Sequence, residues 1–268
     1  MSDIFELRLN SGKLLEENKK VHEIGVIAMG SYLENHGSAL PIDTDIKIAS
    51  YVAFNVALKT GVKFLGTVCT STEYDYVKHG IHNSLEDIIS ELEDIIIKYS
   101  KIGINKLLII NCHGGNLDIS KKIDFLKDNI KKRLENSYSK ELDMDSDVDV
   151  DLEYLKKIKH NFKDYGNIEK LKIDVKSFGY IHAYSEELSI GKYIGIYEEK
   201  KMNKHNPLNY EEIGMVGLVE ARQNNKYINE EAEMVENKPA IVDANYGKEL
   251  TDKMIKESIY CIKEFLKE

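Results

Sequence analysis

The stretch IGVIAMGSYLENHGSALPIDTD, residues 24–45, joins a short apolar run to a cluster of carboxylate and imidazole side chains. The run Ile24–Met29 has the length and composition of a buried strand, and Gly30 ends it. Glu34 and His36 are two residues apart, so in an extended segment their side chains point to the same face, and Asp45 returns after a turn. Carboxylate oxygens with imidazole nitrogens suit zinc, manganese or Fe(II). The stretch therefore predicts a metal site for hydrolytic chemistry.

Strand-like and helix-like segments alternate from this point on. The pattern predicts further strands at Val62–Thr67 and Lys106–Asn111 and helices at about 45–58, 84–102 and 117–134, the second capped by Ser84 with Asp87. Such alternation indicates an α/β fold, with a layered, mainly parallel sheet flanked by helices. Ligands bind at the carboxyl ends of parallel strands. The motif after the first strand and His113 after the third are therefore expected at one edge of the sheet.

The second half of the chain has a weaker pattern. The segment of about residues 135–172 is interpreted as a solvated insertion in a single domain of residues 1–268. Its alternating aspartates at 143–151 suggest a calcium loop, but the glycine of such loops is absent. Ser177–Ala183 is predicted as a strand, and Asn209–Gln223 and Ala244–Phe265 as helices.

Composition limits the classes of partner and compartment. The formal net charge of −9 argues against nucleic acid or an anionic membrane as the partner. The three cysteines form no CxxC pair, which disfavours a disulfide framework or a thiolate zinc site and suits a reducing cytoplasm. No signal peptide or membrane-spanning run is recognised, so a cytoplasmic location is expected.

Several other histidines are candidates for the site. His113 precedes two glycines, which allow a sharp turn and close backbone approach to a ligand, and in company with the first motif a ligand role is favoured over an incidental one. Cys112 should point away from it and pack in the core. His182 could be a general acid or base, with Glu186 or Glu187 completing the metal centre. Alternatively, both glutamates only occupy a helix N-terminus, where the helix dipole favours negative charge.

A small cationic cluster follows the second predicted strand. Lys78, His79 and His82 could form an anion-binding lip beside the metal site, or they could line a solvated loop. The remaining histidines, His22, His160 and His205, are assigned to the surface.

Three motifs in this order resemble signatures of the creatininase family of metal-dependent amidohydrolases. They are Gly30-Ser31-Tyr32-Leu33-Glu34-Asn35-His36-Gly37 with Leu40-Pro41 and Thr44-Asp45, then Asn111-Cys112-His113-Gly114-Gly115-Asn116, then His182-Ala183-Tyr184-Ser185-Glu186-Glu187-Leu188-Ser189. The resemblance implies a creatininase-like fold and a two-metal centre. It implies that one metal is bound by Glu34, Asp45 and His113, and that Asp45 bridges to a second metal held by His36.

The chain departs from the family pattern at one ligand position. Where creatininase carries a metal-binding glutamate two residues after the strand-end histidine, this chain has Gly115. Glu187 is expected to substitute, which also makes creatinine a poor candidate substrate.

Within the family, the resemblance is to a branch that hydrolyses the formamide of a phosphorylated formylaminopyrimidine and releases formate, in riboflavin and coenzyme F420 biosynthesis. It implies two divalent ions, Fe(II) foremost with Zn or Mn as substitutes, and a homo-oligomer. The departing amine would be protonated by His182 or Glu186, and the cationic lip would suit the phosphorylated substrate. The alternatives are another family amidohydrolase acting on a cyclic amide or peptide, and a non-catalytic metal-binding protein.

Overall fold

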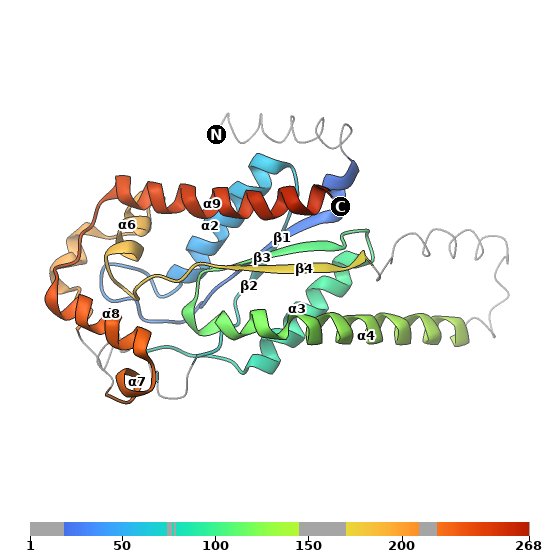
Figure 1. Ribbon diagram of the computed structural model, residues 1–268, viewed down its shortest axis with the longest axis horizontal. Helices are drawn as coiled ribbons and strands as arrows, with labels where there is room; N and C mark the ends of the chain where they lie inside the picture. Colours follow the sequence, from blue (N-terminus) through green and yellow to red (C-terminus); the bar gives the residue numbers. More distant parts are fainter. Residues whose placement is uncertain (1–18, 74–76, 78, 145–169, 209–218, 268) are drawn as a thin grey trace.

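Four parallel strands form one sheet at the centre of the protein (Figure 1). The computed structural model describes residues 19–73, 77, 79–144, 170–208 and 219–267. In sheet order the strands are β2 (Lys63–Val68), β1 (Ile24–Met29), β3 (Lys106–Asn111) and β4 (Lys172–Ser177). The two central strands, β1 and β3, pair in register from Ile24 with Lys106 to Met29 with Asn111. Their carboxyl ends therefore lie side by side, as the sequence predicted.

Helices cover both faces of the sheet (Figure 1). One face carries α2 (Thr44–Thr60) and α9 (Ala244–Lys267), and the other carries α3 (Leu85–Ser100) and α4 (Ile123–Met144). Beside α9 lies α6 (Ser185–Ile194). The remaining described elements are α7 (Val219–Asn224), α8 (Lys226–Asn237) and the 3-10 helices η1 (Lys19–Glu23), η2 (Gly114–Lys122) and η4 (Glu199–Lys204).

Alternate residues of the central strands belong to two separate cores. On β3, Leu108 and Ile110 pack with α2 and α9, whereas Leu107 and Ile109 pack with α3 and α4. Every residue of β1 and β3 is buried. A strand covered on both faces reads as a continuous apolar run, which is why these two strands were recognisable from sequence with the correct bounds.

Later elements differ from the sequence-based prediction. The predicted strand Ser177–Ala183 is wrong, because β4 ends at Ser177 and the following residues lead into α6. Ile181 and Tyr184 are buried by packing against α8 instead of by strand pairing. The helix predicted from Leu117 begins with η2 and continues as α4 to Met144, so it enters the segment interpreted as an insertion. Residues 145–169, with most of the alternating aspartates, and residues 209–218 of a predicted helix lie outside the described residues.

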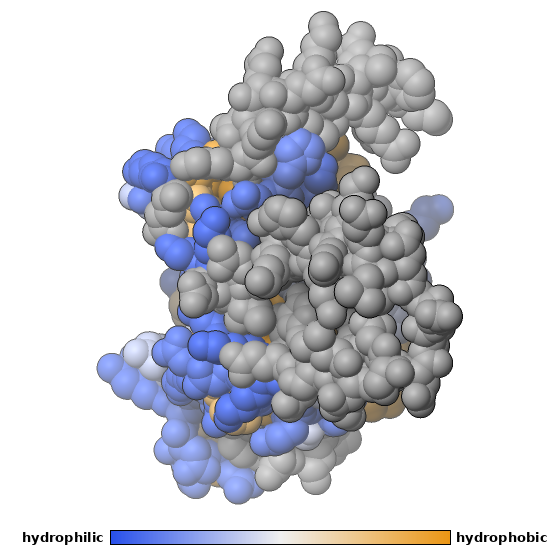
Figure 2. All heavy atoms as spheres, turned by 90° about the vertical axis from the view of Figure 1, so that its right-hand side faces the viewer, coloured by the Kyte–Doolittle hydropathy of each residue, from blue (hydrophilic) through white to orange (hydrophobic). Residues whose placement is uncertain are grey.

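One face of the protein is mostly polar where its residues are described (Figure 2). Figure 2 shows hydrophilic residues over much of the described part of one face, with small apolar areas between them. None of the helices in the described ranges combines the length and the apolar character needed to cross a bilayer.

The core of β3 yields a stability prediction. Ile109 is fully buried against α3 and α4, so Ile109→Ala removes packing and leaves a cavity. The free energy of unfolding should fall by about 2–5 kcal/mol in chemical denaturation. The control Tyr260→Ala, at a largely exposed position of α9, should change it by less than about 0.5 kcal/mol. Equal effects of the two substitutions would contradict this packing.

Candidate metal centre

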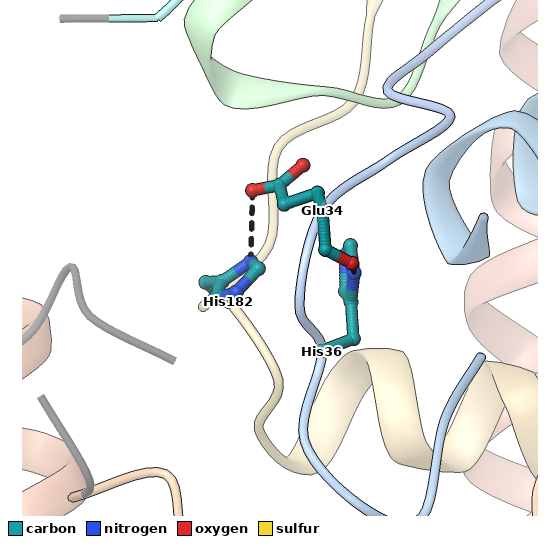
Figure 3. A group of neighbouring side chains, drawn as sticks. All are labelled: Glu34, His36 and His182. Atoms are coloured by element: carbon teal, nitrogen blue, oxygen red, sulfur yellow. Dashed lines mark hydrogen bonds and ion pairs between the residues drawn. The ribbon is translucent and has the colours of Figure 1, made fainter. Parts of the chain in front are cut away.

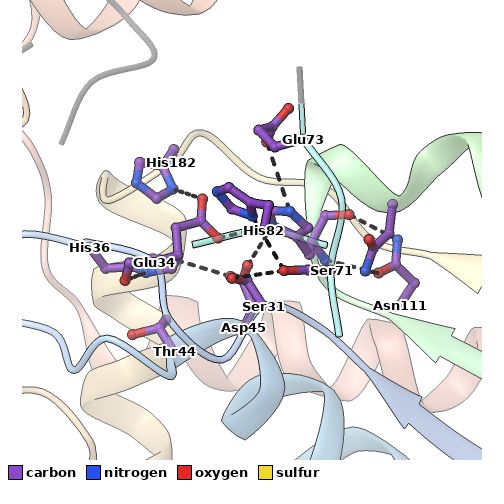
Figure 4. A network of polar contacts seen from close by, with 12 residues as sticks. Ser31, Glu34, His36, Thr44, Asp45, Ser71, Glu73, His82, Asn111 and His182 are labelled. Atoms are coloured by element: carbon purple, nitrogen blue, oxygen red, sulfur yellow. Dashed lines mark hydrogen bonds and ion pairs between the residues drawn. The ribbon is translucent and has the colours of Figure 1, made fainter. Parts of the chain in front are cut away.

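Segments that follow the carboxyl ends of the strands bring five acidic and histidine side chains together, of which Figure 4 labels Glu34, His36 and Asp45. Glu34 and His36 follow β1, Asp45 lies in the first turn of α2, His113 follows β3, and Glu187 lies in the first turn of α6. All five are at most 5% exposed. They form two groups that could each hold a metal ion, Glu34–Asp45–His113 and His36–Asp45–Glu187.

The first group is organised around the imidazole of His113. Its Nε2 lies 3.0 Å from the carbonyl oxygen of Thr72. A carbonyl can only accept a hydrogen bond, so the proton of the neutral ring belongs on Nε2. Nδ1 then directs a lone pair at Asp45 Oδ2, 2.8 Å away, and at Glu34 Oε2, 3.0 Å away. Three electron-rich atoms face one another, an arrangement that a proton or a bound cation between them stabilises.

The second group repeats this arrangement with His36. Its Nδ1 lies 3.0 Å from the backbone oxygen of Glu34, which assigns the ring proton to Nδ1. Nε2 faces Asp45 Oδ1 at 3.0 Å and Glu187 Oε2 at 3.7 Å. Asp45 thus offers one oxygen to each half of the site. This is the geometry expected of a carboxylate that bridges two cations.

The electrostatics show what a bound cation would replace. Burial lowers the pKa of His36, but the carboxylates of Asp45 and Glu187 outweigh it and raise that pKa to about 10. Burial also opposes the charged form of His113, yet Glu34 and Asp45 hold its pKa well above the usual value. Burial raises the pKa of Glu187 to about 8. Without a cation the cluster therefore retains protons at positions that metal ions would occupy.

A buried oxygen of Glu34 is a further indication of a cation site. Among the described residues, Glu34 Oε2 has no hydrogen-bond donor, because Nδ1 of His113 has at most one proton and lies nearer Asp45. A buried carboxylate oxygen without a donor is costly. Glu34 Oε2 belongs to the same group of potential ligands as Asp45 and His113, and a metal ion bound there would satisfy it. The mixture of carboxylate and imidazole donors also suits a metal ion.

Two more histidines contact the other oxygen of Glu34. His79 Nε2 lies 2.6 Å from Oε1, and His182 Nδ1 lies 3.3 Å from the same atom (Figure 3 shows His182). The Nε2 of His182 donates to the backbone oxygen of Asn35 at 2.9 Å. Burial and the neighbouring His36 hold the pKa of His182 well below its usual value. The ring of His182 is therefore neutral near pH 7, with its Nδ1 lone pair facing the site.

The predicted anion-binding lip is only partly visible. Lys78 lies outside the described residues. His79 is not on a lip, because it is 4% exposed and its ring bonds Glu34. His82 is half-buried, and its ring stacks on that of His113 with centroids 5.7 Å apart. Its Nε2 has no hydrogen-bond partner among the described residues, so His82 keeps an unused polar atom beside the site.

Some site residues were missed or misplaced by the sequence analysis. Glu73 lies five residues beyond β2, with Oε2 3.8 Å from His113 Nε2, and its position at the same sheet edge was the available signal (Figure 4). His205, assigned to the surface, is buried. Glu186 lies near Tyr246 of α9 and Glu231 of α8, where burial first and the Glu186 charge second raise the pKa of each. Its predicted catalytic role stays a prediction.

The backbone around His113 explains why a glycine stands at position 115. Asn111 accepts a hydrogen bond from the His113 N–H and donates one to the His113 carbonyl, and Asn116 accepts from the Thr72 N–H. A Cβ on Gly115 would lie 2.0 Å from the Thr72 oxygen that orients the His113 ring. A glutamate at this position would require the Thr72 backbone to move, whereas Glu187 on α6 already places a carboxylate oxygen 3.7 Å from His36 Nε2.

The fold and the paired carboxylate–imidazole groups define a metal-dependent hydrolase of the α/β class, and the comparisons agree. The family model described as creatinine amidohydrolase matches residues 10–262, and the chain belongs to the creatininase family. A solved creatinine amidohydrolase (creatininase) superposes with a TM-score of 0.57 at 13% identity, covering 90% of each chain. A structure titled creatininase Mn gives a TM-score of 0.55 at 14% identity, covering 93% of this chain and 94% of that one.

Relatives with much higher identity come from methanogens. The chain is 71% identical, over 98% of both sequences, to the 2-amino-5-formylamino-6-ribosylaminopyrimidin-4(3H)-one 5'-monophosphate deformylase of Methanococcus voltae. It is 50% identical to the protein of the same name from Methanocaldococcus infernus, over 97% of this chain and 99% of that one.

The contact at Gly115 gives a prediction with a built-in control. Gly115→Ala should displace the Thr72 carbonyl, misorient His113 and weaken metal binding about 10–100-fold in a competitive titration. Gly114→Ala, whose Cβ would meet nothing within 4 Å, should bind metal like the parent protein. Unchanged binding by the Gly115 variant would show that the Thr72–His113 contact does not orient the ligand.

Proposed function

We propose that this protein is a metal-dependent deformylase. It hydrolyses the formamide of 2-amino-5-formylamino-6-ribosylaminopyrimidin-4(3H)-one 5'-monophosphate and releases formate. The observation that carries the proposal is the 71% identity to the Methanococcus voltae deformylase across 98% of both chains. The buried site supports it independently, because its two groups of carboxylate and imidazole ligands suit hydrolysis of an amide.

The ligand set is divided between two positions. Glu34, Asp45 and His113 would hold one divalent ion, and His36, Asp45 and Glu187 would hold the other. Bound divalent ions supply Lewis acidity, which activates water as a nucleophile and polarises the formyl carbonyl. Fe(II) is the native ion in this proposal, with Zn or Mn as substitutes.

His182 is proposed as the group that moves the proton. Its ring is neutral and held through Nε2 by the Asn35 carbonyl, so Nδ1 is free to accept a proton from the attacking water. Glu34 Oε1, 3.3 Å away, stabilises the resulting imidazolium. When the C–N bond of the formamide breaks, Nδ1 returns the proton to the departing ring amine, and the formyl carbon leaves as formate. Glu186 is the second candidate of this proposal, since its Oε2 is buried without a hydrogen-bond partner among the described residues.

The remaining histidines are proposed to position the substrate and one ligand. Lys78 and His82 would contact the phosphorylated part of the substrate, and stacking on the ring of His113 places His82 beside the site. His79 holds Glu34 Oε1 and so leaves Oε2 to the metal. A cytoplasmic location and a homo-oligomeric assembly complete the proposal.

The activity is tested by formate release from the phosphorylated pyrimidine, from N-formyl amino acids and from creatinine in parallel, under anaerobic conditions with Fe(II). Only the pyrimidine should release formate, and creatinine should not be consumed. Asp45→Ala should lower kcat/KM at least about 100-fold, because each half of the site loses an oxygen. Asp43→Ala, which removes only a partly exposed ion pair with Lys47, is the matched control and should stay within about twofold. Full activity of the Asp45 variant would contradict the bridging role.

Metal affinity should depend on pH with a defined sign. The raised pKa values mean that, below about pH 8, an incoming ion must displace protons held by Glu187, His36 and His113. Affinity should therefore increase from pH 6 to pH 8, by about tenfold per unit for each proton released. Calorimetric titrations in buffers with different ionisation enthalpies count those protons. An affinity that does not change with pH would contradict this description.

A further inference from the structure

His205 occupies a buried position between two loops that carry candidate metal ligands. It follows η4, the 3-10 helix Glu199–Lys204, and is 9% exposed. On one side it meets Ala39, three residues after His36, and on the other it meets Ala183, next to His182. The proposed chemistry does not use His205, so its burial in this place needs another explanation.

The hydrogen bonds of His205 define which nitrogen carries the proton. The backbone N–H of Ala39 donates to Nδ1 at 3.3 Å, so Nδ1 is the acceptor. Nε2 therefore carries the proton and donates it to the Ala183 carbonyl at 2.8 Å. Burial lowers the pKa of His205, which keeps this neutral form in place near pH 7.

Ala183 has a backbone conformation that needs outside support. Its φ of 53° lies in the left-handed region, which residues other than glycine rarely adopt. In this conformation its N–H donates to Glu187 Oε2 at 2.7 Å. The same oxygen lies 3.7 Å from His36 Nε2. The orientation of the Glu187 carboxylate toward His36 thus depends on the conformation of Ala183.

We propose that His205 is a positioning residue for the half of the metal centre formed by His36, Asp45 and Glu187. This inference rests on the proposed metal centre. The bond from His205 Nε2 to the Ala183 carbonyl fixes the start of α6 relative to the η4 segment. The bond from the Ala39 N–H to Nδ1 is one of several contacts between the η4 segment and the His36 loop. Two further bonds hold the same loop to the η4 segment: Glu198 N–H to the Ala39 carbonyl at 2.9 Å and the Ser38 hydroxyl to the Lys204 carbonyl at 3.3 Å.

A simpler role is that His205 only satisfies two buried backbone groups. That role predicts lower stability of the protein without metal and no selective effect on metal binding. A positioning role predicts instead that the affinity for one of the two ions falls. It also predicts that this affinity depends on the hydrogen bond donated to Ala183. Gln and Asn substitutions separate these roles, since the side-chain amide of Gln reaches the position of Nε2 and that of Asn reaches only the position of Nδ1.

The experiment compares the whole protein with His205→Gln, His205→Asn and Lys204→Ala, the last at an exposed position of the same segment. Competitive titration with Zn²⁺ gives the affinity of each ion, and the melting temperature without metal reports stability. The Asn variant should lose about 10–100-fold in affinity for one ion and keep the other. The Gln and Lys204 variants should bind both ions within about threefold of the parent affinities.

Other results would overturn the inference. Parent-like binding of two ions by the Asn variant, or equal losses in the Gln and Asn variants, would show that the bond to Ala183 does not position the ligands. Absence of metal binding in the parent protein would instead defeat the proposed metal centre itself, and this inference with it. If the Asn variant does not fold, imidazole ¹⁵N spectra of the parent decide. A His205 ring that is protonated on Nε2, and whose ¹⁵N resonance shifts when metal is added, supports the positioning role. A ring protonated on Nδ1, or a resonance that metal does not shift, overturns it.

Discussion

The site depends on the position of the Asp45 carboxylate between two histidines that have already used their N–H groups. His36 donates to the Glu34 carbonyl and His113 to the Thr72 carbonyl, so each presents a lone pair to a different oxygen of Asp45. Backbone carbonyls that fix the tautomer of a histidine in this way are the usual outer shell of a metal ligand. Without cations, lone pairs of nitrogen and oxygen atoms face one another in a buried space. The pKa values of His36 and His113 are raised for this reason, because a proton on either ring relieves the repulsion.

The parallel sheet determines where these groups meet. Because β1 and β3 are neighbours in register, the residues after Met29 and Asn111 emerge next to each other. Gly30 lets α2 begin close to the end of β1, since a Cβ there would lie 2.8 Å from the backbone of Asp45. The strand residues below the ligands, among them Met29 and Ile110, are fully buried. The α6 segment supplies the last carboxylate from far along the chain, and its approach is controlled by loop contacts.

The parts that sequence could predict are those governed by local pattern and by topology. The two central strands were found with the correct bounds because both faces are covered, so that each strand has an uninterrupted apolar run such as Leu107–Ile110. The meeting of Glu34, His36, Asp45 and His113 followed from the rule that parallel strands end at one edge. The predicted strand Ser177–Ala183 was wrong because Ile181 is buried by packing against α8, which gives the same apolar pattern as a strand. His205 could not be recognised because its partners are backbone groups of distant loops, and Glu73 lies in a segment without periodicity.

Anomalous diffraction from crystals of the Fe(II)- or Zn-loaded protein, collected at the absorption edge of the metal, would locate the bound ions. We expect two metal ions in each chain, one ligated by Glu34 and His113, the other by His36 and Glu187, with one oxygen of Asp45 on each. A single metal ion, or two ions of which only one contacts Asp45, would contradict this expectation.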